Sequence, residues 1–347
     1  MFDPRVVGHA VLALVLGVCP VAFAAQTIPA TMHAVVIDQP GGPEVLQVRT
    51  LAVPSVDANE VLIAVRAASV ASWDIEIRQS MAYINQPKFP YTLGSDGSGV
   101  IAAVGSAVKR FKVSDEVYAY CWDNPKGGFY AEYVAVPADC VSKLPKGVSL
   151  EAAGALGASG LTALSGIDRA LHIRRGESLI IHGASGAVGT LALQIAKVRG
   201  ARVLATASGE EGVALVRKLG ADVAIDGRTG DITVAAREFA PKGVDAVLAL
   251  AGGPALDKCL DALRADGRVA YPNGVNPAPK PRPGITLTPY DALFGDQKDQ
   301  FVELNRVVEA KHFEVPIAAT FDLADAAAAH RRVEAGRVPG KVLIRIR

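Results

Sequence analysis

Residues 178–207 read SLIIHGASGAVGTLALQIAKVRGARVLATA. The segment begins as an apolar strand, passes through three glycines into a helix rich in alanine and leucine, and ends in a second strand. Glycines at this spacing let the chain turn tightly and let backbone N–H groups at the helix start approach a pyrophosphate. Because they lie between a strand and a helix within about thirty residues, the pattern predicts a dinucleotide site rather than an ordinary glycine-rich turn. The residues expected to line this site are Gly183, Ser185, Gly186, Ala187, Val188 and Gly189.

The residues after the second strand bear on which dinucleotide is bound. An NAD enzyme commonly has an acidic residue about twenty residues after the first glycine, where it binds the ribose 2′-hydroxyl. This chain has Thr-Ala-Ser at positions 206–208, and these small side chains leave room for a 2′-phosphate. We therefore expect NADPH in preference to NADH, with Ser208 and the more distant Arg228 at the phosphate. Glu210 and Glu211 follow closely and favour NADH instead.

The chain has 347 residues, half of them hydrophobic, and a formal net charge of +1. This length favours two domains with ample core, and the balanced charge indicates no nucleic-acid partner. From Met32 to about Ala158, short segments rich in valine and isoleucine alternate with glycine and proline, which predicts a barrel-like β domain. From Leu161 strands alternate with helices, which is typical of a doubly wound parallel sheet in an α/β domain.

The second domain is predicted to contain five strands, at Leu179–His182, Arg202–Thr206, Ala221–Ile225, Val244–Leu250 and Gly267–Tyr271. The proline-rich segment Asn273–Gly284 is expected to form an extended loop. A helix at Lys298–Ala310 and a last strand at Val342–Arg345 are expected to return to the first domain.

The N-terminal segment has the pattern of a secretory leader. Residues 6–18 are nearly continuous apolar sequence after Arg5, and Ala22-Phe23-Ala24 has the small residues of a cleavage site. The pattern predicts that residues 1–24 are a signal peptide and that the protein is exported to the periplasm. The alternative is a start assigned too early, with Met32 as the first residue and a cytoplasmic location. The apolar core is too short to span a bilayer, and no later segment is long enough.

The cysteines do not form a disulfide framework. Of the four, Cys19 lies in the predicted leader, and Cys121, Cys140 and Cys259 would remain. An odd number argues against complete pairing. A bridge between Cys121 and Cys140 is conceivable in an oxidising compartment, but single buried thiols are the favoured interpretation.

Beyond the glycine-rich loop, several short motifs carry a resemblance. They are PGGPEVL at 40–46, LGSD at 93–96, SDEV at 114–117, GLTA at 160–163 and GKVL at 340–343. With these, nearly all of Met32–Arg347 resembles the medium-chain dehydrogenase/reductase superfamily, in its zinc-independent quinone oxidoreductase branch, which includes zeta-crystallin. The resemblance implies a GroES-like β-barrel catalytic domain, residues 32–158 with 296–347, and a Rossmann cofactor domain, residues 159–295. Such proteins are often homodimers or homotetramers.

The sequence departs from the zinc-using relatives of this superfamily. Where they have an early cysteine and a Gly-His-Glu run, this chain has Ser72 and Gly94-Ser95-Asp96. Its six histidines show no ligand spacing, so no metal site is expected. Without a Lewis acid, alcohol oxidation is disfavoured, whereas a quinone or activated alkene is already electrophilic.

The resemblance implies hydride transfer from NADPH to a quinone or similar conjugated carbonyl compound. An NADPH-dependent 2-alkenal or enoyl reductase is the alternative on the same scaffold. A non-catalytic NADPH-binding redox sensor or structural protein is the alternative outside enzymes. The family commonly has an asparagine and a tyrosine at the substrate where this chain has Ala71 and Glu76, so those two roles do not carry over.

Three candidates for catalysis remain. Asp74 matches the family, and an ion pair with Arg78 that supports the pocket is favoured over proton transfer. Thr162 lies in the GLTA motif, which in the family approaches the nicotinamide. Tyr83 could cover a flat acceptor, as could Trp73, Trp122 and Tyr130, although simple packing is the commoner role of such residues.

Further cofactor contacts are expected where strands of the parallel sheet end, because dinucleotides bind at that edge. Gly252 follows the fourth predicted strand and Asn273 follows the fifth. Lys341 matches the terminal Gly-Lys of the family and is expected to reach the cofactor, with a solvated surface lysine as the equal alternative.

Overall fold

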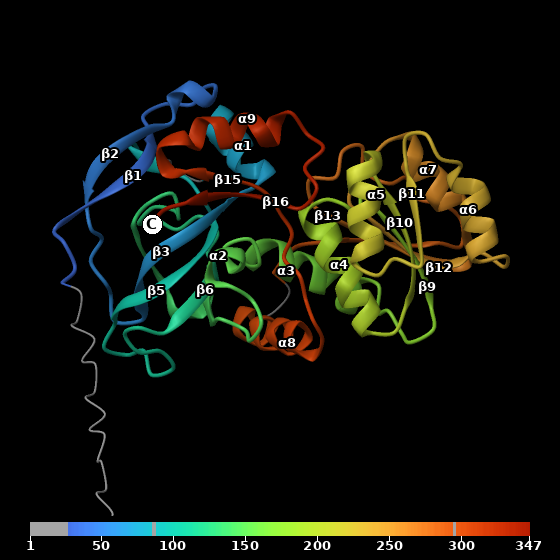
Figure 1. The fold of residues 1–347 in the computed structure, drawn as a ribbon, viewed down its shortest axis with the longest axis horizontal. Coiled ribbons are helices and arrows are strands. Elements are labelled where there is room, and N and C mark those ends of the chain that lie inside the picture. Colours follow the sequence, from blue (N-terminus) through green and yellow to red (C-terminus); the bar gives the residue numbers. More distant parts are fainter. Residues whose placement is uncertain (1–26, 85–87, 294–295) are drawn as a thin grey trace, which may run out of the picture.

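The computed structural model describes residues 27–84, 88–293 and 296–347. The predicted leader, residues 1–24, lies outside the described residues. Figure 1 shows a barrel-like half, coloured blue to cyan, beside a half built on a parallel sheet, coloured yellow to orange, with α3 (Gly157–Leu164) and α8 (Gln297–Ala310) between them. Among the described residues, no helix is long and apolar enough to cross a bilayer.

The parallel half contains a sheet of six strands. Their order is β11 (Val223–Asp226), β10 (Arg202–Ala207), β9 (Ser178–His182), β12 (Val244–Ala249), β13 (Leu263–Pro272) and β14 (Thr286–Tyr290). Every pairing between neighbours is parallel. All five residues of β9 are buried, as its continuous apolar sequence predicts for a central strand.

Helices cover both faces of this sheet. Leu179 and Ile181 of β9 pack in one apolar cluster with α4 (Ala187–Val198) and α5 (Gly209–Lys218). Ile180 packs on the other face with α6 (Ile232–Phe239) and α7 (Pro254–Asp261). Because side chains alternate between the faces of a strand and both faces are covered, the three central residues of β9 are all apolar. The predicted doubly wound sheet is confirmed.

Two details of this sheet were not predicted. Strand β14 is a sixth strand, and β13 starts at Leu263 instead of Gly267. Pro289 lies within β14, which is possible because β14 is at the edge of the sheet. The loop predicted at Asn273–Gly284 contains no helix or strand, as expected.

The barrel half is built around a long strand, β3 (Glu60–Val70). A sheet of seven strands has the order β15 (Ile317–Asp322), β16 (Lys341–Arg345), β3, β5 (Asp96–Val104), β6 (Glu116–Tyr120) and β8 (Val141–Lys143), with β7 (Tyr133–Pro137) also paired to β3. A smaller sheet has the order β2 (Gln47–Ala52), β1 (Thr31–Ile37) and β4 (Tyr91–Thr92). Three further helices are α1 (Ser72–Ser80), α2 (Leu150–Ala153) and α9 (Ala326–Glu334).

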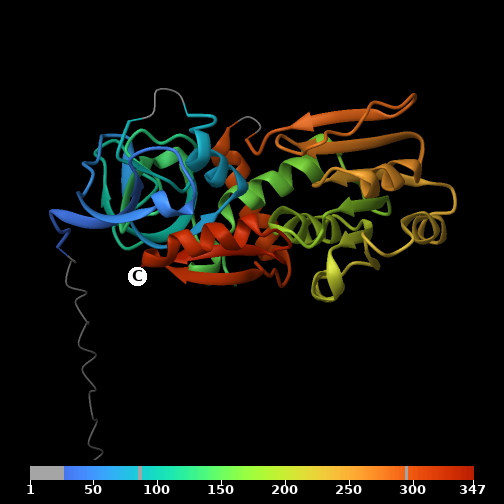
Figure 2. The ribbon, with the colours of Figure 1, turned by 90° about the horizontal axis from the view of Figure 1, so that it is seen from above.

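The C-terminal segment returns to the barrel, as predicted. Strand β16 pairs with β3, and Val342 lies opposite Val70. Figure 2 shows this segment, in red, against the barrel, while the orange strands β13 and β14 lie in the other half. The return places the first residues of β16 between the two halves.

Candidate active site

The glycine-rich loop after β9 has the shape that a dinucleotide requires. Gly183 has φ +82°, a left-handed conformation that glycine adopts readily. A Cβ on Gly189 would lie 2.5 Å from the Gly183 carbonyl oxygen, so α4 packs tightly on the turn. A Cβ on Gly186 would meet only that oxygen, at 3.5 Å, so the space into which a side chain of residue 186 would point is otherwise open. The first-turn N–H groups of α4, at Ala187 and Val188, lack intrahelical acceptors and favour an anion there.

The ends of β10 and β11 bring together the two residues expected at a 2′-phosphate. Ser208 is exposed and precedes α5. Arg228 donates to Asp226 at 3.2 Å, and the Gly209 N–H donates to the same carboxylate oxygen at 3.1 Å. The hydrogen bonds from Arg228 keep the pKa of Asp226 below its ordinary value. The Thr206 hydroxyl already has a hydrogen-bond partner within the protein, because it lies 2.8 Å from His182 Nδ1.

The C-terminal strand reaches this loop. Gly340 forms an isolated parallel bridge with Gly186, and its N–H donates to the Ser185 carbonyl oxygen at 2.8 Å. Lys341 follows and is only 7% exposed, so it is no solvated surface lysine. Its ammonium lies 5.5 Å from the centroid of the Trp73 ring and has no hydrogen bond or ion pair within the described residues.

Two carboxylates are buried near Lys341. Asp74 accepts from the Ala71 N–H at 2.8 Å through Oδ2, whereas Oδ1 has no partner within the described part of the chain. Burial raises the pKa of Asp74 from 3.8 to about 7, and the charge of Asp96 acts in the same direction. Lys341 lowers the pKa of both carboxylates, although burial keeps that of Asp96 above its ordinary value. Asp74 therefore titrates near neutral pH.

The sequence indicated no role for Asp96, which was named only as part of the LGSD motif. It is fully buried, accepts from the Ser69 hydroxyl, and accepts from the Ala158 N–H at 3.1 Å. The available signal was an acidic residue inside a strand of otherwise small and apolar residues.

The expected ion pair between Asp74 and Arg78 is wrong. The Arg78 guanidinium is fully buried and donates to Glu334 at 2.6 Å. It also contacts His330 Nδ1 at 3.2 Å, and His330 Nε2 lies 3.2 Å from the Tyr130 hydroxyl, which donates to Asp74 at 3.4 Å. Asp74 and Arg78 are therefore connected only through the buried hydrogen bonds of Tyr130 and His330. The reason is that Asp74 caps its own helix while Arg78 faces α9.

The aromatic candidates divide into two groups. Trp122 lies at the centre of the first, with its ring centroid 6.1 Å from Trp73 and 6.2 Å from Tyr83. Tyr83 is 61% exposed and its hydroxyl donates to Glu76. Tyr130 is fully buried in the hydrogen-bonded chain described above, so packing is its role. A cavity beside the first group is lined by Asp74, Ser95, Cys121, Trp122 and Asn124 among others.

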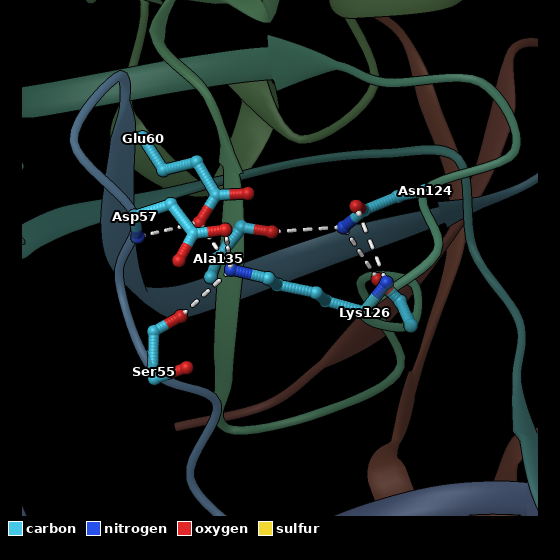
Figure 3. A network of polar contacts seen from close by, with 7 residues as sticks. Ser55, Asp57, Glu60, Asn124, Lys126 and Ala135 are labelled. Atoms are coloured by element: carbon cyan, nitrogen blue, oxygen red, sulfur yellow. Dashed lines mark hydrogen bonds and ion pairs between the residues drawn. The ribbon is translucent and has the colours of Figure 1, made fainter.

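The loop after Trp122 is held against the barrel by hydrogen bonds and ion pairs of Asn124 and Lys126 (Figure 3). The Lys126 ammonium donates to Asp57 at 2.8 Å and to Glu60 at 2.6 Å. The Asn124 amide donates to a carbonyl oxygen of β7 at 2.9 Å. These contacts hold the cavity wall in one position.

The other predicted residues have the following surroundings. The Thr162 hydroxyl donates to the Ala158 carbonyl oxygen at 2.8 Å within α3. Gly252 lies against the proline-rich loop, where a Cβ would be 2.4 Å from the Pro277 carbonyl oxygen. Asn273 is exposed and donates to Asp291. Gly252 and Asn273 follow β12 and β13 at the same edge of the sheet as Gly183.

The described residues contain no group of three or more histidine, cysteine, aspartate or glutamate side chains that could hold a metal ion. Cys121, Cys140 and Cys259 are free thiols, in agreement with the favoured interpretation of the sequence.

Comparisons with known proteins decide the family. An alcohol dehydrogenase GroES-like domain matches residues 57–146, and a domain described as zinc-binding dehydrogenase matches residues 219–344. Human quinone oxidoreductase is 32% identical over 331 residues, which cover 90% of this chain and 97% of the human protein. The chain belongs to the medium-chain dehydrogenase/reductase superfamily, in its quinone oxidoreductase branch.

Other members of the superfamily are comparably similar. The chloroplastic NADPH-dependent alkenal/one oxidoreductase of Arabidopsis thaliana is 32% identical over 327 residues, covering 92% of this chain and 80% of that protein. A solved NAD-dependent alcohol dehydrogenase has a TM-score of 0.82 and 30% identity, and a mycobacterial structure in complex with NADPH has 0.79 and 28%. Each alignment covers 91% of this chain and 100% of the other. The matches support an enzyme that uses NAD(P)H, and not the non-catalytic alternative.

Proposed function

We propose that this protein transfers a hydride from NADPH to a quinone or a similar conjugated carbonyl compound without a zinc ion. The observation that carries the proposal is the bridge between Gly186 and Gly340, which joins the dinucleotide loop to the barrel half and to its buried Lys341. The names of the human and Arabidopsis relatives and the mycobacterial complex with NADPH support the same conclusion.

On the cofactor side, the loop from Gly183 to Gly189 and the N-terminus of α4 hold the pyrophosphate. Ser208 and the Arg228 guanidinium hold the 2′-phosphate, since arginine recognises phosphate through paired hydrogen bonds. Gly252 and Asn273 border the nicotinamide half at the strand ends, and Thr162 borders it from α3.

On the acceptor side, bound NADPH supplies the hydride. Trp73, Trp122 and Tyr83 provide flat apolar surfaces for a conjugated ring. The Lys341 ammonium stabilises the negative charge that develops on the acceptor oxygen, an effect that burial strengthens. Asp74 can hold or release a proton near neutral pH because burial raises its pKa to about 7.

The side chains in the cavity do not suit a catalytic zinc ion. Zinc prefers cysteine and histidine ligands, and the corresponding positions are Ser72 and Ser95. The Ser95 hydroxyl accepts a hydrogen bond from the Trp73 indole N–H at 2.9 Å. The Ser95 hydroxyl therefore orients the Trp73 indole beside the cavity.

A 2-alkenal or enoyl reductase is the second candidate, and the name of the Arabidopsis relative favours it. Both candidates are compared by measuring oxidation of NADPH and NADH with 1,4-benzoquinone, 9,10-phenanthrenequinone and 2-hexenal, with and without EDTA. We expect quinones to support oxidation of NADPH in preference to NADH, with no effect of EDTA. Turnover of 2-hexenal alone would select the second candidate, and loss of activity in EDTA would contradict the metal-free reaction.

A further inference from the structure

Cys121 and Cys140 lie side by side at one end of a strand pair. Cys121 directly follows β6 and Cys140 directly precedes β8. These strands are antiparallel, and Ala119 lies opposite Val141. Both cysteines pack against the same apolar cluster of the barrel, and each shifts the pKa of the other's thiol.

The two thiols differ in reactivity. Cys121 is buried, and the neighbouring Cys140 thiol, together with burial, raises the pKa of its thiol. Cys140 is partly exposed, and the neighbouring Cys121 thiol lowers the pKa of its thiol, against burial and the charge of Asp139, which raise it. The Arg110 guanidinium also lowers this pKa and donates to the carbonyl oxygens of Ala138 and, at 2.8 Å, Val141, on either side of Cys140. Because Cys140 is the more accessible of the two thiols and the Arg110 guanidinium favours its thiolate, we expect Cys140 to be the nucleophile of the pair.

The buried member of the pair belongs to the wall of the acceptor cavity. The Cys121 N–H donates to the Ser95 carbonyl oxygen at 2.8 Å, and the Ser95 hydroxyl in turn holds the Trp73 indole. Cys121, Ser95 and Trp122 line the same cavity. A displacement of Cys121 toward Cys140 therefore moves the backbone on which both indoles depend.

We propose that Cys121 and Cys140 are a redox modification site, which a hydroperoxide closes to a disulfide and which thereby changes the acceptor end of the cavity. With hydrogen peroxide, the Cys140 thiolate attacks one oxygen, so that an S–O bond forms, the O–O bond breaks, and the released hydroxide becomes water. The Cys121 sulfur then attacks the sulfenic sulfur, the S–S bond forms, and the oxygen leaves as a second water with the Cys121 proton. The two sulfurs lose two electrons, which the peroxide gains, and a dithiol reductant reverses the change.

The modification is tested by peptide mapping of the full chain. Reduced, desalted protein is exposed to hydrogen peroxide, quenched with an alkylating agent and digested. We expect a cross-linked peptide joining Cys121 and Cys140, formed at least about tenfold faster than Cys259 is lost to alkylation, because Cys259 lacks a thiol partner and burial raises its pKa to about 12. Cys140→Ser leaves Cys121 available for alkylation, and the matched control Cys259→Ser leaves the cross-link unchanged. Sulfinic acid at Cys140 with Cys121 still reduced would overturn the proposal.

The effect on the cavity is tested without turnover, so that it does not depend on the proposed acceptor. Trp73 and Trp122 are the two tryptophans of the chain; Trp122 lines the cavity, and the Trp73 ring centroid lies 6.1 Å from that of Trp122. We expect closure of the disulfide to change tryptophan emission in the wild type and in Cys259→Ser, and to leave it unchanged in Cys140→Ser or, if that variant does not fold, Cys140→Ala. A disulfide that forms without a change in emission would refute the coupling. A change in quinone KM on closure, with NADPH affinity unaltered, is the matching kinetic result, and this arm alone rests on the proposed function.

Discussion

Gly340 donates its backbone N–H to the Ser185 carbonyl oxygen at 2.8 Å, which ties the last strand of the chain to the dinucleotide loop. Gly340 has φ +101°, and a Cβ there would lie 2.4 Å from the Pro316 carbonyl oxygen. Only glycine suits this position. The contact fixes Lys341 relative to the loop, so a site shared by the two halves of the molecule depends on a backbone contact between them.

Two glycines of the loop predict opposite outcomes when replaced by alanine. A Cβ on Gly189 would lie 2.5 Å from the Gly183 carbonyl oxygen and 2.6 Å from the Ala184 Cα, so Gly189→Ala forces α4 away and costs about 1–3 kcal/mol of stability. A Cβ on Gly186 would meet only the Gly183 carbonyl oxygen, at an ordinary contact distance of 3.5 Å, so Gly186→Ala keeps the melting temperature but lowers NADPH affinity at least about tenfold. Thermal unfolding and NADPH titration distinguish them. Equal NADPH affinity of Gly186→Ala and wild type would show that the pyrophosphate binds elsewhere.

Asp74→Asn tests the raised pKa of the buried carboxyl. Because the pKa of Asp74 is about 7 in the folded protein and 3.8 ordinarily, the folded state keeps a proton that the unfolded state loses. The free energy of unfolding therefore falls as the pH rises from about 4 to about 7, by up to about 4 kcal/mol from this group, and levels off above. Asparagine removes this contribution, so urea unfolding of the variant should depend less on pH within that window. Parallel curves for variant and wild type would show that Asp74 ionises at its ordinary pKa.

The main elements of the fold could be predicted because they depend on local patterns. The glycine spacing and the apolar run of β9 specify a βαβ unit whatever surrounds it. Strand β14 gave no such signal, since it is an edge strand that contains Pro289 and few buried residues. The helix α9 is rich in alanine, and its buried face is apparent only once the barrel is assembled.

Side-chain partners in the site were harder to predict than the backbone. Asp74 and Arg78 stand four residues apart on one helix, which is the usual spacing of a helical ion pair. The actual partner of Arg78, Glu334, lies on α9, more than two hundred positions away in the sequence. Tyr130 was a candidate to cover the acceptor, but it is buried and contacts His330, which lies two hundred positions away in the sequence. Long-range packing decides these contacts, and no local pattern carries it.

Arg228→Ala tests the choice between NADPH and NADH. Its guanidinium is bonded to Asp226, whose carboxylate also accepts from the N–H of Gly209, the residue after Ser208. The loss of a charge-assisted contact to the 2′-phosphate should raise KM for NADPH about tenfold and leave KM for NADH unchanged. Arg237→Ala, at another exposed arginine of the same half, is the matched control. An equal rise for both cofactors would mean that Arg228 acts on the fold of the loop and not on the phosphate.

Arg78→Met tests the buried contact between α1 and α9. The guanidinium is fully buried and bonded to Glu334, to His330 and, at 3.0 Å, to the Gly41 carbonyl oxygen. Methionine fills much of the volume but leaves these acceptors unpaired, so we expect a loss of about 3–5 kcal/mol in urea unfolding. Glu334→Gln, which keeps an acceptor and is partly exposed, should cost about 1–3 kcal/mol. Because the two side chains contact each other, the double variant should lose less than the two single losses combined. Additive losses would show that the ion pair between Arg78 and Glu334 contributes nothing to the docking of α9.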